Sequence, residues 1–133
     1  MRMGSGSTGL VAGALALLAG AGPLRAEDCA KAATQTDLNI CAGQARAAAD
    51  AALNATYGAL VAAPTMADRL DRLRAAERAW VGYRDAQCAF EGARFEGGSM
   101  QPMAVDGCAE ALTRRRTTEL REALACAKEG GPC

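Results

Sequence analysis

The chain of 133 residues contains no histidine, and its aromatic residues are one tryptophan, two tyrosines and two phenylalanines. Without histidine it lacks the side chain that most often serves as a general base and a ligand that completes many zinc sites. Its six cysteines include no CxxC pair, the spacing typical of zinc-binding and redox-active thiols. We therefore expect a protein that is not an enzyme and that binds no metal or cofactor.

The serines and carboxylates that remain do not form a familiar catalytic arrangement. Ser99 follows two glycines, but the sequence around it is not the G-x-S-x-G elbow of serine hydrolases. Glu77 and Asp85 are eight residues apart on one predicted helix. That spacing separates them by about 12 Å along the axis, more than is usual in glycosidases. These patterns favour a binding function over catalysis.

Long apolar runs are absent except near the start of the chain. Arg2 precedes an apolar run over residues 10–21, and the small residue Ala26 follows it, so residues 1–26 are predicted to be a signal peptide. An uncleaved N-terminal anchor is the alternative, although the run is short for a membrane span. Cys29 does not directly follow a small-residue lipobox, so no lipid anchor is implied. We expect residues 27–133 to be soluble, periplasmic or secreted, and free of the membrane after cleavage.

The chain also lacks an excess of charge of either sign. The chain has 15 basic and 15 acidic residues, and removal of residues 1–26 leaves a slight acidic excess. Such a balance gives no electrostatic basis for binding nucleic acid or an anionic membrane.

The cysteines are expected to add the stability that the small core cannot provide. A domain of this size with few aromatic residues gains modest stability from its core alone, and an even number of cysteines in an exported chain predicts disulfides. Six cysteines allow fifteen connectivities, which sequence cannot decide. We favour the pairs Cys29–Cys41, Cys88–Cys108 and Cys126–Cys133.

Helical periodicity extends through most of residues 27–133. Apolar side chains at helical spacing predict helices over residues 34–60, 66–90 and 105–127, and Thr34 is the expected N-cap of the first. Residues 91–106 lose this period and are rich in glycine, which predicts an ordered loop. The predicted fold class is all-α: a small disulfide-stapled three-helix bundle with a Gly-rich loop between the second and third helices. Residues 127–133 form a short tail that contains Cys133.

Five short motifs follow one another in this region, in the order C-x11-C, D-x2-LN-x2-Y, W-x2-YRD-x2-C, GGS-x2-P and C-x3-LT-x2-R-x3-L. Besides cysteines and leucines, their main residues are Asp50, Asn54, Tyr57, Trp80, Tyr83, Arg84, Asp85, Gly97, Gly98, Ser99, Pro102 and Arg116. In this order and spacing they resemble the LprI-like lysozyme inhibitor domain of bacterial exported proteins. The resemblance implies an extracytoplasmic helical domain and, for the namesake of the family, inhibition of lysozyme. Cys126 and Cys133 lie beyond the pattern.

The charged motif residues are predicted to be structural. We expect Arg116 to pair with Asp85 or Asp50 and Asn54 to complete a buried polar network, because a charge removed from water must be paired. A role of these residues in catalysis is the less favoured alternative.

The Gly-rich loop has two interpretations. Glu96, Gly97, Gly98, Ser99 and Pro102 either form ordinary turns, or they form a rigid projection that enters an enzyme cleft. In the second case Glu91, Glu96 and Asp106 face a basic partner.

Two functions follow. The first is an inhibitor that blocks the cleft of a lysozyme or an endogenous muramidase, and the alternative is an envelope interaction module with another protein partner.

Overall fold

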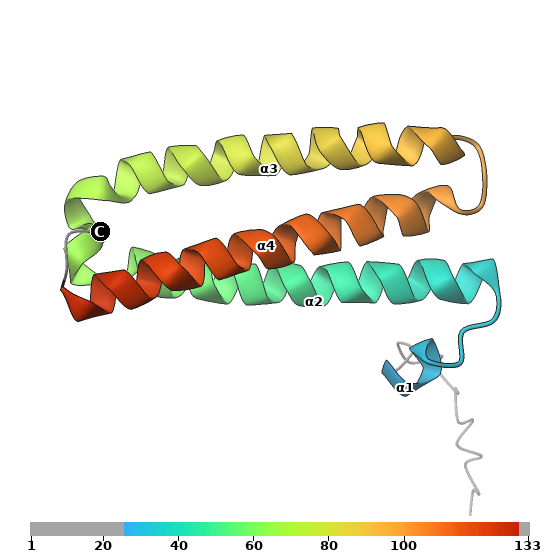
Figure 1. Ribbon diagram of the computed structural model, residues 1–133, viewed down its shortest axis with the longest axis horizontal. Helices are drawn as coiled ribbons and strands as arrows, with labels where there is room; N and C mark the ends of the chain where they lie inside the picture. The colour runs from blue at the N-terminus through green and yellow to red at the C-terminus, as the bar shows by residue number, and fades with distance from the viewer. Residues whose placement is uncertain (1–25, 131–133) are drawn as a thin grey trace, which may run out of the picture.

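The computed structural model describes residues 26–130, which form three long helices and three short ones. The long helices are α2 (Gln35–Val61), α3 (Leu70–Gly92) and α4 (Gln101–Glu129), and they lie side by side (Figure 1). The short ones are α1 (Ala26–Cys29), η1 (Pro64–Arg69) and η2 (Ala93–Phe95). No strand occurs in residues 26–130. The predicted all-α three-helix bundle is confirmed.

The first long helix begins and ends as its sequence predicts. The Thr34 hydroxyl accepts a hydrogen bond from the Asp37 backbone N–H (3.1 Å) and donates one to the Asp37 carboxylate (2.6 Å), so Thr34 is the N-cap. At the other end Ala63 is extended, as the residue before a proline prefers to be, and Pro64 starts the 3-10 turn η1. The second predicted helix therefore has a 3-10 first part, and α3 proper begins at Leu70.

The loop between the second and third long helices is shorter than predicted. Helix α3 continues to Gly92, η2 follows it, and α4 begins at Gln101 instead of Val105. Pro102 occupies the first turn of α4, where its missing N–H costs no helical hydrogen bond. A proline that indicated a loop in the sequence is thus the start of a helix.

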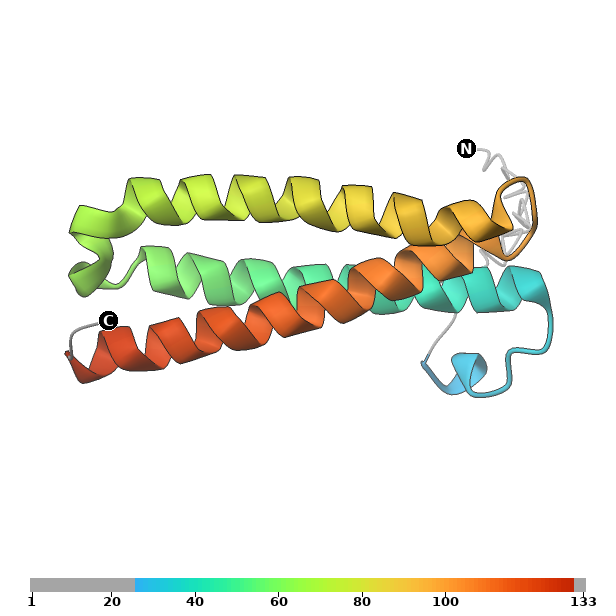
Figure 2. The same ribbon diagram turned by 45° about the horizontal axis from the view of Figure 1, so that its top comes forward.

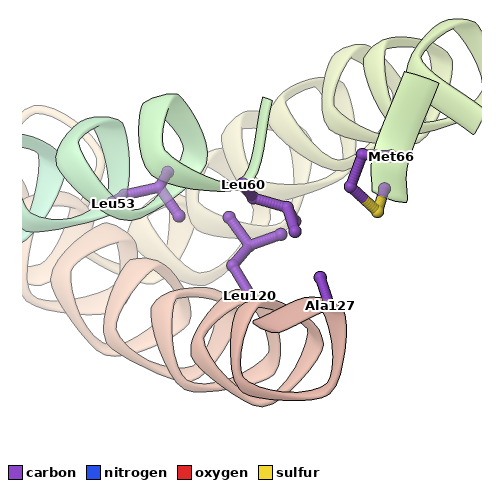
Figure 3. Packing of buried hydrophobic residues seen from close by; sticks show 5 residues of the cluster. All are labelled: Leu53, Leu60, Met66, Leu120 and Ala127. Atoms are coloured by element: carbon purple, nitrogen blue, oxygen red, sulfur yellow. The ribbon is translucent and has the colours of Figure 1, made fainter. Parts of the chain in front are cut away.

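Helix α4 holds the bundle together. It packs along both α2 and α3 and runs obliquely to α2 in Figure 2, whereas α2 and α3 make little direct backbone contact among residues 26–130. Near η1 the packing is apolar, and Figure 3 shows Leu53, Leu60, Met66, Leu120 and Ala127 converging there. The other half of the bundle buries small or polar side chains instead: Ala49, Arg84, Cys88, Ala109 and Thr113. Because that half contains few large apolar side chains, it depends on ionic and covalent links.

Two of the predicted disulfides are confirmed. Cys29–Cys41 ties α1 to α2, and Cys88–Cys108 ties the end of α3 to the start of α4, with Cα–Cα distances of 5.6 and 5.5 Å. The third predicted pair, Cys126–Cys133, involves a residue outside those that the structure describes and stays a prediction. The predicted signal peptide also falls almost entirely outside the described residues. Within residues 26–130, the helices are too short or too polar to qualify as membrane spans.

Candidate functional site

A buried arginine connects the three long helices at the middle of the bundle. Arg84 of α3 is 8% exposed, and its guanidinium donates hydrogen bonds to Asp50 of α2 (2.9 Å) and to its neighbour Asp85 (3.0 Å). It also donates to the hydroxyl of Thr113 of α4 (3.3 Å), which donates in turn to Asp50 (3.3 Å). The guanidinium carbon lies 5.3 Å from the centre of the Trp80 ring. These contacts satisfy the charge of Arg84 and fix its side chain.

The Arg84 network extends toward the Gly-rich loop through a second arginine. In Arg46 of α2, Nε lies 3.9 Å from the Asp50 carboxylate, and Nη1 donates a hydrogen bond to the Asp106 carboxylate of α4 (2.9 Å). The hydrogen bond to Asp106 raises the pKa of Arg46, against an opposing effect of burial. The pair of Arg46 with Asp106 therefore links α2 to α4.

The prediction that Arg116 pairs with Asp85 or Asp50 is wrong. Arg116 donates to Glu77 of α3 from Nε (2.9 Å) and Nη2 (2.5 Å), and from Nη1 to Glu119 (2.7 Å). Burial alone lowers the pKa of Arg116, but the hydrogen bonds to Glu119 and Glu77 outweigh burial and raise it. Arg116 is thus a separate α3–α4 link, because the antiparallel register places it beside Glu77.

Asn54 does not belong to a buried network either. Its side chain is exposed, and it lines a groove together with Tyr57. Sequence reasoning named Arg84 among the structural motif residues, but it assigned the pairing with Asp50 or Asp85 to Arg116, although a signal for Arg84 existed. Arg84 lies one turn from both Trp80 and Cys88, on the inward side of α3, where a charge needs partners.

The Gly-rich loop is exposed and held in place. Gly97 has φ 73°, and two backbone bonds close the turn, from Gly98 N–H to Phe95 O (2.9 Å) and from Gln101 N–H to Gly98 O (3.2 Å). The Asn39 side chain of α2 donates to the Ser99 carbonyl (2.9 Å), and the Cys88–Cys108 disulfide links the helices on either side. Residues 96–100 and Pro102 are all exposed. The loop is therefore a supported projection at one end of the bundle (Figure 1).

Three large side chains on α3 and just before α4 are exposed. Phe90, two residues beyond Cys88, is 75% exposed, and Met100 is 42% exposed. Tyr83 lies two turns earlier on α3 and is 55% exposed. We call Phe90 together with residues 96–100 the loop surface. Sequence reasoning predicted its glycines and Ser99 but missed Phe90, which it had placed inside the second helix without assigning a face.

A cavity of about 400 Å³ lies below the loop surface. The residues that line it include Arg46, Asp85, Cys88, Glu96, Gln101 and Val105. Among residues 26–130 no three cysteines or carboxylates lie together as a metal site.

Residues 26–120 match the family model described as "Lysozyme inhibitor LprI", a range that includes the Arg84 network and the whole loop surface. The chain belongs to the LprI family. A relative by sequence is the uncharacterized protein R02472 of Rhizobium meliloti (strain 1021), which is 49% identical over 113 residues. The match covers 76% of this chain and 81% of the relative. No solved structure matches the chain.

Proposed function

We propose that this protein is an exported inhibitor that binds a lysozyme-type glycosidase and blocks its cleft with the loop surface. Membership of the LprI family, whose model describes lysozyme inhibitors rather than enzymes, is the observation that carries the proposal. In this proposal residues 1–26 act as the export signal, and the protein works in the periplasm or outside the cell.

The shape and rigidity of the loop support its role as the inhibitory element. The Cys88–Cys108 disulfide and the Asn39–Ser99 hydrogen bond hold it before any partner arrives. A loop that is already ordered loses little conformational entropy on binding, so more of the contact energy appears as affinity. Exposed Phe90 offers the kind of aromatic side chain that often dominates binding energy at interfaces.

The charges near the loop support encounter with a basic enzyme. Glu96 is exposed and makes no ion pair among residues 26–130, and Glu91 accepts only from the Gln87 amide (3.0 Å). Asp106 differs from the sequence expectation, because Arg46 already neutralises it. Two carboxylates, rather than three, are therefore available to attract a basic partner.

The proposal is tested by titrating the purified, oxidised protein against a c-type lysozyme in a cell-wall lysis assay. Lysis should fall to a plateau near an equimolar ratio. A simultaneous change of Gly98, Ser99 and Met100 should abolish inhibition while the thermal melt stays intact. Glu96→Gln should slow association, and Asp68→Asn, an exposed carboxylate near η1 at the opposite end, serves as its matched control.

Two results would count against this function. Full lysis at a large excess of the protein would leave the alternative of an envelope interaction module with another partner. Unaltered inhibition by the folded triple variant would exclude the loop surface as the contact.

A further inference from the structure

A groove opens between α2 and α3, away from the loop surface. It exists because both helices pack on α4 and make little contact with each other. Its volume is about 450 Å³, within the range of small-molecule sites. The lining residues are Leu53, Asn54 and Tyr57 of α2 and Arg74, Glu77, Arg78 and Val81 of α3. Val81 lies about 14 Å along the helix axis from Phe90, so the groove and the loop surface can be occupied independently.

The groove combines an apolar wall with polar groups that have no partner among residues 26–130. Leu53 is buried, Tyr57 is half-buried and Val81 is 39% exposed. Within residues 26–130 the Asn54 amide makes no hydrogen bond and the Arg78 guanidinium makes no ion pair. Asn54 can both donate and accept, and Arg78 can donate to a carboxylate through two parallel hydrogen bonds.

The charge of the groove is positive. Glu77 is the one acidic residue in the lining. Its carboxylate accepts hydrogen bonds from Nη2 and Nε of Arg116 (2.5 and 2.9 Å), so its charge is neutralised. Arg74 reaches Asp71 at 3.2 Å, but the Asp71 side chain is 98% exposed and such pairs are weak. Arg74 and Arg78 therefore present available positive charge, in a chain whose total charge is balanced.

We propose that the α2–α3 groove binds a saccharide that carries a carboxylate. Arg78, with Arg74 beside it, binds the carboxylate, and the Asn54 amide bonds to hydroxyl or acetamido groups of the sugar. Tyr57 and Val81 contact the apolar face of the pyranose ring. N-acetylmuramic acid has this chemistry, and choosing it rests on the proposed function, since lysozyme-type enzymes act on polymers that contain it.

The test is an NMR titration of the ¹⁵N-labelled, oxidised protein with N-acetylmuramic acid. N-acetylglucosamine, which is the same sugar without the lactyl carboxylate, is the matched probe. Amide shifts should change at residues 53–57 and 74–81 with the acidic sugar and far less with the neutral one. Arg78→Gln should weaken binding about tenfold. Arg72→Gln is the matched control, because Arg72 is exposed on the same helix but does not line the groove.

Several outcomes would overturn the proposal: no shift with N-acetylmuramic acid, an equal response to lactate alone, or equal losses in Arg78→Gln and Arg72→Gln. Cosedimentation with insoluble cell wall from which an amidase has removed the stem peptides, so that the lactyl carboxylates are free, separates wall-bound from soluble sources of the ligand when the free sugar competes. The Arg78→Gln variant should inhibit lysozyme as strongly as the unaltered protein does. The groove and the inhibitory function can thus fail separately.

Discussion

Replacement of Arg84 by methionine tests whether the Arg84 network holds the half of the bundle that lacks large apolar side chains. Methionine keeps most of the apolar stem of the side chain, but it removes the hydrogen bonds to Asp50, Asp85 and Thr113. Removing one partner of a buried ion pair costs about 3–5 kcal/mol. The Asp50 side chain is 35% exposed and regains some hydration, so we expect a loss of about 2–3 kcal/mol.

Thermal denaturation followed by circular dichroism, with the disulfides intact, measures this loss. For a domain of this size it corresponds to a melting temperature lower by about 10–20 °C. Asp85→Asn is the matched control, because its side chain is 56% exposed and its pair with Arg84 should contribute less than about 1 kcal/mol. A melting temperature of Arg84→Met within a few degrees of the unaltered protein would refute the reasoning.

Three further perturbations probe the links between helices. Replacing Cys88 and Cys108 by serine removes a disulfide between cysteines that are 20 residues apart, and it should lower the free energy of unfolding in urea titrations by about 3 kcal/mol. A change below about 1 kcal/mol would contradict this expectation. Gly92→Ala should destabilise the protein by about 1–3 kcal/mol, because the added Cβ would overlap Val105. Gly82→Ala is the control: it has open space around it and should stabilise the protein by about 0.5–1 kcal/mol. Equal effects of the two variants in thermal melts would argue against the α3–α4 packing. Arg116→Met should lower stability by about 1–2 kcal/mol through loss of the Glu77 pair, and an unchanged melt with lost inhibition would instead place Arg116 on the binding surface.

Much of the architecture could be predicted from local signals in the sequence. Thr34 and Pro64 mark the boundaries of α2 through capping and the missing proline N–H, and both act over only a few residues. Proximity along the chain also favours the pairing of Cys88 with Cys108, because the two cysteines flank one turn between neighbouring helices. Pro102 misled the prediction, since a proline is compatible with both a loop and a first helical turn.

The partners of the charged residues could not be predicted in the same way. Helical period determines which side of α3 carries Arg84, but it does not determine the axial register of α3 against α2 and α4. A shift by one turn, about 5 Å, would offer Arg116 a different acid. The packing of side chains between all three helices decides that register, and it places Arg116 beside Glu77 and Arg84 beside Asp50.

The sequence by itself determined an all-helical chain and its resemblance to the LprI family, and it favoured two disulfides that the structure contains, because these depend on residue type and short spacing. Only the tertiary structure decided that Arg84 is the centre of the polar network, that Phe90 is exposed, and that Asn54 faces a groove. The physical reason is that exposure and ion pairing depend on which helices pack together and in what register. Contacts between residues far apart in the chain determine both the packing of the helices and their register.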